Sequence, residues 1–263
     1  MEWRDEEILM LVKVYPTPSK KYGETVCSAG ITRHGKWIRV YPVPYRDLPP
    51  SQQFVKFQWI RARITQAKEK LSRPESHKID LNSIKLLEKI PAGDKWGERE
   101  NYFLPYVSKS LEVLFENQKI HNVSLGAFKP KKVKDFIIEP SEDEWDLGQK
   151  GILSQTSLFN DRRATLEKTP YRFRYKFTCN DDRCVGHNMI ILDWEVFESY
   201  RRWKRIYKDG KLTLEKLKEK WLTYFFQKRE SYFVVGTESE FGKFMILSII
   251  SPKRKESQLR FGF

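Results

Sequence analysis

The amino-acid sequence predicts an α+β protein in which β-structure dominates. Short apolar or alternating runs, which are typical of strands, fill the first 65 residues and recur after residue 170. Runs with an apolar residue every three or four positions, typical of amphipathic helices, occur near residues 106–118 and after residue 193. We therefore expect a small N-terminal barrel, followed by a mixed part built of β-hairpins and basic helices.

The predicted N-terminal strands are short and separated by turn residues. Four or five strands of this kind, strongly curved, close into a small barrel of the OB or SH3-like type. We expect residues 66–105 to be loop-rich and polar, and residues 124–139 to form a loop that feeds a strand returning to the barrel. The predicted strands are residues 7–15, 24–31, 36–41 and 54–65.

The C-terminal half combines predicted strands with two basic helices. Asp193 can cap the first helix, and the second helix is expected over residues 213–228. The apolar stripe of the first helix is Val196, Tyr200, Trp203 and Tyr207. The predicted strands are residues 171–178, 189–192, 232–235 and 244–250.

We expect two domains, joined by the acidic stretch PSEDEWD at residues 140–146. The first covers residues 1–140 as a barrel-like domain with the helix near residues 106–118 inserted. The second covers residues 147–263 and holds a Cys/Cys/His turn, the two basic helices and a closing hairpin.

The charge balance favours a phosphate-bearing partner. The chain carries 49 Lys and Arg against 35 Asp and Glu, a net charge of +14. Residues 201–263 carry 16 Lys and Arg against 7 Asp and Glu, so they hold +9 of that total. Cations on phosphates release condensed counterions, which favours nucleic acid. The alternative is a Lys- and Glu-rich surface of the thermophilic kind.

Nothing at the N-terminus is typical of a targeting signal. The first ten residues, MEWRDEEILM, are acidic, and no apolar run approaches the roughly 20 residues of a membrane span. The three cysteines, Cys27, Cys179 and Cys184, are an odd number, which is unusual for a secreted chain. We expect a cytoplasmic protein with no membrane partner.

The pattern Cys179-x4-Cys184-x2-His187 offers three ligands of the types that zinc prefers. They lie on the turn between two predicted strands, where a short loop can bring them together. Zinc is therefore a possible cofactor, although the spacing specifies no fourth ligand and no cofactor is certain. The alternatives are a hairpin with reduced, inert cysteines and a catalytic zinc with an open coordination position. Candidates for the fourth ligand are Asp181, Asp182, His34 and a water molecule.

A second group, His187 with Asp193 and Glu195, suggests a different chemistry. An acidic pair at the end of an apolar strand can hold Mg²⁺ beside a phosphodiester, as in a metal-dependent nuclease. The alternative interpretation is that Asp193 caps the following helix, with Glu195 in its first turn.

Three predicted strands interleave aromatic and basic residues, and the basic helices extend this charge. Alternation sends each class to one face of a strand, where aromatics can stack on bases and cations can follow the backbone. The alternative is that the aromatics face the core while the cations are only solvated. The candidate nucleic-acid-binding residues are Arg39, Arg61, Arg172, Arg174 and Lys176 on the strands, with Arg201, Lys204, Arg205 and Lys208 on the first basic helix.

Two stretches resemble known sequences. VCSAGI at residues 26–31, followed by GKWIR at residues 35–39, resembles the opening of uncharacterised microbial proteins described as carrying dual OB-type domains. The run from FTC through CVGH to DWE, residues 177–195, is similar to a recurring pattern in unnamed microbial proteins. The resemblance implies a barrel and nucleic-acid binding, and it implies no catalytic residue.

These observations lead to a predicted nucleic-acid-binding protein that contacts single strands or the backbone of DNA or RNA. A metal-dependent nuclease or other nucleic-acid-processing enzyme, using Asp193, Glu195 and His187, is one alternative. The other is a protein-interaction module of a larger complex, which would use the same aromatic residues as an apolar patch.

Overall fold

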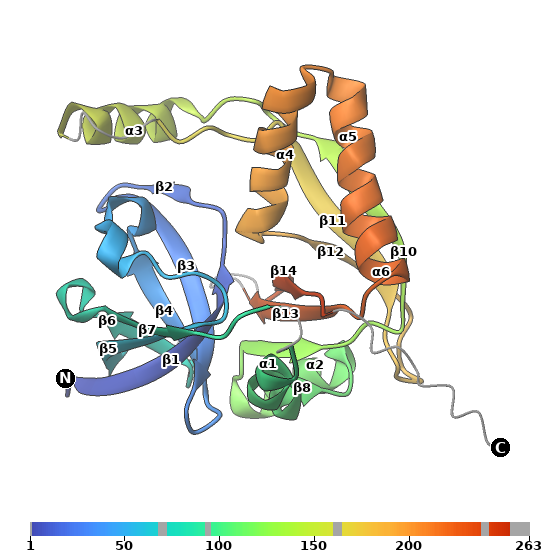
Figure 1. Cartoon of the computed structure of the whole chain (residues 1–263), viewed down its shortest axis with the longest axis horizontal. Coiled ribbons are helices and arrows are strands. Elements are labelled where there is room, and N and C mark those ends of the chain that lie inside the picture. The colour runs from blue at the N-terminus through green and yellow to red at the C-terminus, as the bar shows by residue number, and fades with distance from the viewer. Residues whose placement is uncertain (1, 68–72, 93–95, 160–164, 238–241, 253–263) are drawn as a thin grey trace.

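The computed structural model describes residues 2–67, 73–92, 96–159, 165–237 and 242–252. Figure 1 shows the N-terminal barrel on one side, a pair of long helices on the other, and a sheet that contains β13 and β14 between them. The predicted α+β class with an N-terminal barrel is confirmed. No helix in the described part of the chain is long and apolar enough to cross a membrane.

Five strands form the closed N-terminal barrel. The ring runs β1-β3-β4-β6-β5, and β5 pairs back to β1. Neighbours are antiparallel except for β4 and β6, which are parallel. Outside the ring, β2 (Thr17–Ser19) pairs with β3, and β7 (Lys85–Lys89) pairs with β5. The ring strands are β1 (Arg4–Lys13), β3 (Gly23–Thr32), β4 (Trp37–Val43), β5 (Gln58–Gln66) and β6 (Ser76–Ile79).

Close contact between β1 and β3 depends on Gly30. A Cβ atom at this position would lie 2.1 Å from the Leu9 carbonyl oxygen, so a side chain would separate the two strands. The connection from β4 to β5 contains two 3₁₀ helices, η1 (Tyr45–Asp47) and η2 (Pro50–Gln52). Pro at the start of η2 fits the geometry of a helix N-terminus.

The segment expected to be loop-rich, residues 66–105, also contains regular secondary structure in its described part. This segment contributes β6 and β7, then η3 (Leu81–Ser83), α1 (Trp96–Phe103) and η4 (Leu104–Tyr106). The strands SHKI and KLLEK carry few apolar residues, so their sequence signal is weak. β6 gains its stability from pairing with two neighbours, β4 and β5.

Leu125 and Ala127 pack in the barrel core, but residues 124–139 add no strand to the barrel ring, which corrects that expectation. They form β9 (Leu125–Phe128) and β10 (Lys132–Pro140), which pair with strands from the C-terminal half. β10, β11 (Tyr171–Thr178) and β12 (His187–Ile190) make an antiparallel sheet of three strands. A four-stranded sheet has the order β14-β13-β9-β8, and its other members are β8 (Val107–Ser108), β13 (Tyr232–Thr237) and β14 (Phe244–Ile250).

The two predicted basic helices are present. Asp193 caps α4 (Trp194–Tyr207) as expected, and its side chain accepts a hydrogen bond from the Glu195 N–H. A second helical segment begins at Gly210 and packs beside α4 (Figure 1). It consists of α5 (Gly210–Lys218), a π-helical turn η5 (Glu219–Tyr224) and α6 (Phe225–Gln227).

Two further helices differ from the sequence-based expectation. α2 (Leu111–His121) begins after Ser110, because the Ser110 side chain accepts a hydrogen bond from the Val113 N–H and caps the helix there. α3 (Leu147–Phe159) follows the acidic stretch and was not predicted. It contacts β2 and β3 and extends away from the other helices (Figure 1).

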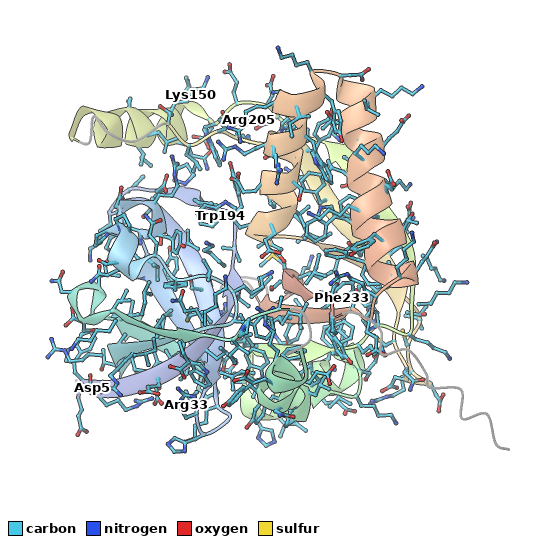
Figure 2. All side chains as sticks on the ribbon, in the orientation of Figure 1. Asp5, Arg33, Lys150, Trp194, Arg205 and Phe233 are labelled. Atoms are coloured by element: carbon cyan, nitrogen blue, oxygen red, sulfur yellow. The ribbon has the colours of Figure 1, made fainter. Side chains whose placement is uncertain are left out.

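The four-stranded sheet contributes to two apolar cores. Successive residues of β13 point to opposite faces, so Val234 packs with the barrel core while Phe233 packs with the core under α4 and η5. Phe233 is labelled in Figure 2. Arg39 joins the barrel to this sheet, because its guanidinium donates to the Thr237 carbonyl at 3.0 Å and the Ser124 carbonyl at 2.9 Å. The four-stranded sheet therefore lies between the two cores and contributes side chains to both.

Candidate metal centre and nucleic-acid interface

The loop between β11 and β12 folds back on itself. The Asp181 carboxylate accepts hydrogen bonds from the Arg183 backbone N–H at 3.1 Å and from its guanidinium. The Cys184 N–H donates to the Asp181 carbonyl, and Gly186 adopts φ +95°, which suits glycine. The loop thereby brings Cys179 and Cys184 to the same place.

Four side chains of metal-ligating type converge at this loop. The ligand atoms of Glu112, Cys179, Cys184 and His187 all lie within 4.8 Å of one another. His187 Nε2 is 3.4 Å from Cys184 Sγ and 2.8 Å from Glu112 Oε1. Cys179 is 3% exposed, and the side chains of Glu112 and His187 are also largely buried. We call this group the Glu112 cluster.

Glu112 is the member that sequence reasoning missed. It lies on α2 and precedes His187 by 75 residues, so no spacing pattern connects them. The three residues named as candidates for a fourth ligand, Asp181, Asp182 and His34, are not in the cluster. Asp181 instead accepts from Ser110 at 2.8 Å and from Arg183, while Asp182 and His34 are exposed.

The N-terminus of α2 points at the cluster. The Leu111 backbone N–H donates to the Cys179 sulfur, and the Cys179 N–H donates to Cys184 Sγ at 3.1 Å. Burial raises the pKa of the Cys179 thiol, Leu111 opposes the shift, and the Glu112 carboxylate adds to it. For Glu112, burial raises the pKa, but hydrogen bonds from its own backbone and His187 produce a net lowering. Glu112 Oε2 is buried without a hydrogen-bond partner.

Asp193 and Glu195 are close together but are occupied by a lysine. Asp193 is 1% exposed, and its Oδ2 accepts from the Ile249 N–H at 2.7 Å and from Lys56 Nζ at 3.2 Å. Lys56 Nζ is also 3.2 Å from Glu195 Oε2. The ammonium group thus lies where a cation shared by both carboxylates would bind. His187 is a member of the Glu112 cluster and does not lie beside Asp193 and Glu195.

Lys56, Asp193 and Glu195 shift one another's pKa values. Burial raises the pKa of Asp193, and the Lys56 charge opposes that shift. Burial lowers the pKa of Lys56, but Asp193 and Glu195 more than reverse this, so the net shift is upward. Trp194, labelled in Figure 2, follows Asp193 and makes an edge contact with the Tyr45 ring of the barrel. This group therefore lies where the start of α4 meets the barrel.

On β11 the aromatic residues face the core. Phe173, Tyr175 and Phe177 are at most 1% exposed, whereas Arg172 and Lys176 are exposed on the opposite face. Arg174 is half-buried and donates to Asn188 Oδ1 and to the Asn188 carbonyl, both at 2.9 Å. The aromatic side of this strand therefore packs the interior and does not form an open stacking surface.

The other predicted cations are divided between structural contacts and open surface. Arg39 is buried at the junction described above, and Arg61 pairs with Glu7 at the barrel surface. Arg201 pairs with Glu167 at 2.8 Å and with Glu198 at 2.6 Å. Exposed on α4 and at its end are Lys204, Arg205 (labelled in Figure 2) and Lys208.

A basic groove outside the predicted set lies between β10 and α6. Its volume is about 620 Å³. We call it the lysine groove. The sequence does show four lysines within the six residues KPKKVK at 129–134, and that local density is the signal that could have found it. Its lining includes Lys129, Lys131, Lys132, Lys134, Leu222, Phe226, Arg229 and Glu230.

Family models place the chain among proteins of unknown function. Residues 107–262 match a domain of unknown function, DUF8757, and the chain therefore belongs to that family. Residues 4–105 match a second domain of unknown function, DUF8758. No protein of curated function matches the chain. The Glu112 cluster and the lysine groove lie in the DUF8757 part, whereas the sequence-based domain boundary was placed at residues 140–147.

Proposed function

We propose that this protein binds nucleic acid through the sugar–phosphate backbone, with the lysine groove as the principal contact. The observation that carries the proposal is the concentration of cations around one concave surface. Lys131, Lys132 and Lys134 are exposed there, and each can neutralise a phosphate and release a counterion. Lys129 pairs with Glu230 at 3.3 Å, which leaves the other three lysines as the main positive charge.

The composition of the groove favours a single strand. Leu222 and Phe226 lie in its wall beside the cations, and Phe226 is half-buried. The Phe226 ring also contacts Tyr175 and Phe233, so its position is fixed by the core. A base that stacks on such a ring gains about 1–3 kcal/mol, and a single strand can present its bases in this way.

A second basic region supports the same proposal. Lys204, Arg205 and Lys208 are exposed near the end of α4, close to the start of α5. The lysine groove is lined in part by Phe226 and Gln227 of α6. Figure 1 shows α6 at the other end of the helical segment from the start of α5. With 1.5 Å per residue, that segment spans about 27 Å. A strand that contacts both regions would follow α5, which carries exposed Lys211 and Lys218.

The barrel supports this proposal through its architecture, and its predicted cations are not proposed as nucleic-acid contacts. We infer an OB-type barrel from the closed five-stranded ring, which is the architecture on which OB folds bind oligonucleotides. However, Arg39 and Arg61 are engaged in contacts within the protein. Lys56 likewise fills the space between Asp193 and Glu195, so we do not carry the predicted Mg²⁺ site into the proposal.

The test is a salt titration of the full chain against single- and double-stranded DNA and RNA. The triple variant Lys131→Glu/Lys132→Glu/Lys134→Glu should weaken binding at least tenfold and reduce the slope of log K against log salt. Each lost phosphate contact lowers that slope by about 0.7 for a single strand, or about 2 for all three. Lys204→Glu/Arg205→Glu/Lys208→Glu should have a smaller effect in the same direction.

A matched control is Lys36→Glu/Lys85→Glu/Lys89→Glu, which makes the same charge change at exposed lysines of the barrel. It should bind as the unmodified protein does. Equal losses in the control and the groove variant would mean that net charge alone governs binding. Absence of binding to every nucleic acid at low salt would exclude the proposal, and Mg²⁺-dependent cleavage that Asp193→Asn abolishes would establish the nuclease instead.

A further inference from the structure

We propose that Glu112, Cys179, Cys184 and His187 hold one Zn²⁺ ion in a closed structural site. The donor set is two sulfurs, one imidazole nitrogen and one carboxylate oxygen, all of which are ligands that zinc accepts. Four protein ligands complete a tetrahedron and leave no open position, which is typical of structural zinc. The proposal does not depend on nucleic-acid binding.

The spacing of the donor atoms suits this ion. With Zn–S near 2.3 Å and Zn–N or Zn–O near 2.0–2.2 Å, tetrahedral donor pairs lie about 3.3–3.8 Å apart. His187 Nε2 is already 3.4 Å from Cys184 Sγ, and the four donor atoms span at most 4.8 Å. His187 Nε2 and Glu112 Oε1, at 2.8 Å, need only separate slightly to share the ion.

The surroundings of the cluster favour a cation. The Glu112 carboxylate is hydrogen-bonded to His187 and Cys184, so its oxygens already face the other donor atoms of the cluster. Both sulfurs accept backbone N–H groups, Cys179 from Leu111 and Cys184 from Cys179. Such hydrogen bonds stabilise thiolates and orient the ligands of a metal. Zinc would displace the thiol protons and satisfy the buried charge.

The ion would join two segments that are distant in sequence. Glu112 belongs to the first turn of α2, whereas Cys179 and Cys184 belong to the β11–β12 loop and His187 begins β12. The same two segments are already tied by Ser110 to Asp181 and by Arg183 to Glu116. A metal bound here would fix α2 on the hairpin, so its binding energy would contribute to folding.

The first experiment measures metal in the full chain, purified under reducing conditions without a chelator. We expect about one zinc per chain, and a Co²⁺-exchanged sample should show the absorption of tetrahedral cobalt with thiolate ligands. A chelator should remove the ion and lower the melting temperature, and added Zn²⁺ should restore it. A metal-free protein whose melting temperature does not respond to Zn²⁺ would overturn the proposal.

Variants test the ligands individually. Cys179→Ser and Glu112→Gln should each lower zinc affinity at least tenfold, whereas Cys27→Ser, which changes the cysteine of the barrel, should retain a full equivalent. If Cys179→Ser fails to fold, Glu112→Gln and its cobalt spectrum still decide the point. Unchanged zinc affinity in Glu112→Gln would refute the four-ligand site. Equal zinc loss in Cys27→Ser would assign the metal elsewhere.

Discussion

Among single residues, His77 is the clearest case of a titratable group held in one state. It is 3% exposed on β6, its Nδ1 contacts the Glu75 carbonyl at 2.9 Å, and its Nε2 contacts the Arg4 guanidinium at 3.1 Å. A neutral ring with its proton on Nδ1 satisfies both neighbours, because it donates to the carbonyl and accepts from Arg4. Burial lowers the pKa of His77, and the Glu75 carbonyl opposes this only in part.

The stability of the protein should therefore decrease as pH falls through the ordinary histidine pKa of about 6.5 and towards the lower folded-state pKa of His77. The folded-state pKa lies below that of the unfolded chain, so the unfolded state takes up the proton first and is favoured. His77→Asn, which keeps an amide donor for the Glu75 carbonyl, should flatten this part of the profile. Denaturant unfolding at several pH values measures it. His34→Asn, at an exposed histidine, is the control, and a profile unaltered by His77→Asn would contradict the prediction.

Asp193 should be more important to stability than a helix cap alone. Asparagine caps a helix about as well as aspartate, but it carries no charge to match Lys56. Asp193→Asn should lower the free energy of unfolding by about 1–3 kcal/mol, since a buried charge loses one partner. Glu195→Gln, at a side chain that is 56% exposed, should cost less than about 1 kcal/mol. If Asp193→Asn is as stable as the unmodified protein, the charge of Asp193 contributes nothing to stability and the residue acts only as a helix cap.

At the scale of elements, α2 depends on the hydroxyl of Ser110. This side chain is fully buried, accepts from the Val113 N–H and donates to Asp181 of the β11–β12 loop. Ser110→Ala should destabilise the protein by about 1–2 kcal/mol, because the cap and a buried hydrogen bond are lost together. Ser154→Ala, at an exposed serine of α3, should have almost no effect in the same thermal unfolding assay. A similar cost for both would exclude the specific role.

Local signals in the sequence predicted individual helices and strands well, but they predicted poorly which of these elements pack against each other. Asp193 before an apolar stripe predicted α4, because capping and periodicity involve only neighbouring residues. The pairing of β10 with β11 could not be predicted in this way. Apolar residues such as Phe136 indicate that a segment is a strand, but they do not indicate which strand pairs with it. Glu112 was missed for the same reason: only tertiary packing brings α2 to the cysteine loop.

Alternation in β11 shows a second limit of sequence reasoning. Period 2 predicted that aromatic and basic residues lie on opposite faces, and they do. It could not decide which face is covered, because that depends on the helices that pack against Tyr175 and Phe177. Arg39 is similar, since its burial results from the four-stranded sheet that packs on the barrel. The lysine groove could not be predicted either, because it forms only when α6 packs beside the lysine-rich residues 129–134.

At the scale of the whole molecule, the segments that match the two family models share the barrel core. This core includes residues from beyond the boundary at residues 105–107, and Arg39 donates hydrogen bonds to the Ser124 and Thr237 carbonyls there. The shared core residues are Leu125, Ala127, Tyr232, Val234, Leu247 and Ile250. The two parts are therefore expected to stabilise each other.

We expect the full chain to unfold in a single transition, with circular dichroism and tryptophan fluorescence giving the same midpoint. A fragment of residues 1–106 should be markedly less stable than the full chain, because it exposes the barrel surface that the missing strands cover. Two well-separated transitions in the full chain, with the fragment as stable as the first, would show that the parts are independent.

The junction formed by Arg39 also has a consequence for the order in which the chain is made. The barrel strands leave the ribosome first, while the carbonyl of Thr237 and the apolar residues of β14 come last. About 140 residues separate the barrel segment, which ends at residue 106, from β14. Synthesis at roughly 5–20 residues per second takes on the order of ten seconds for them. Throughout that interval the apolar side of the nascent barrel is uncovered and must be kept from binding other proteins. This fold therefore requires that the nascent chain be protected from aggregation during translation.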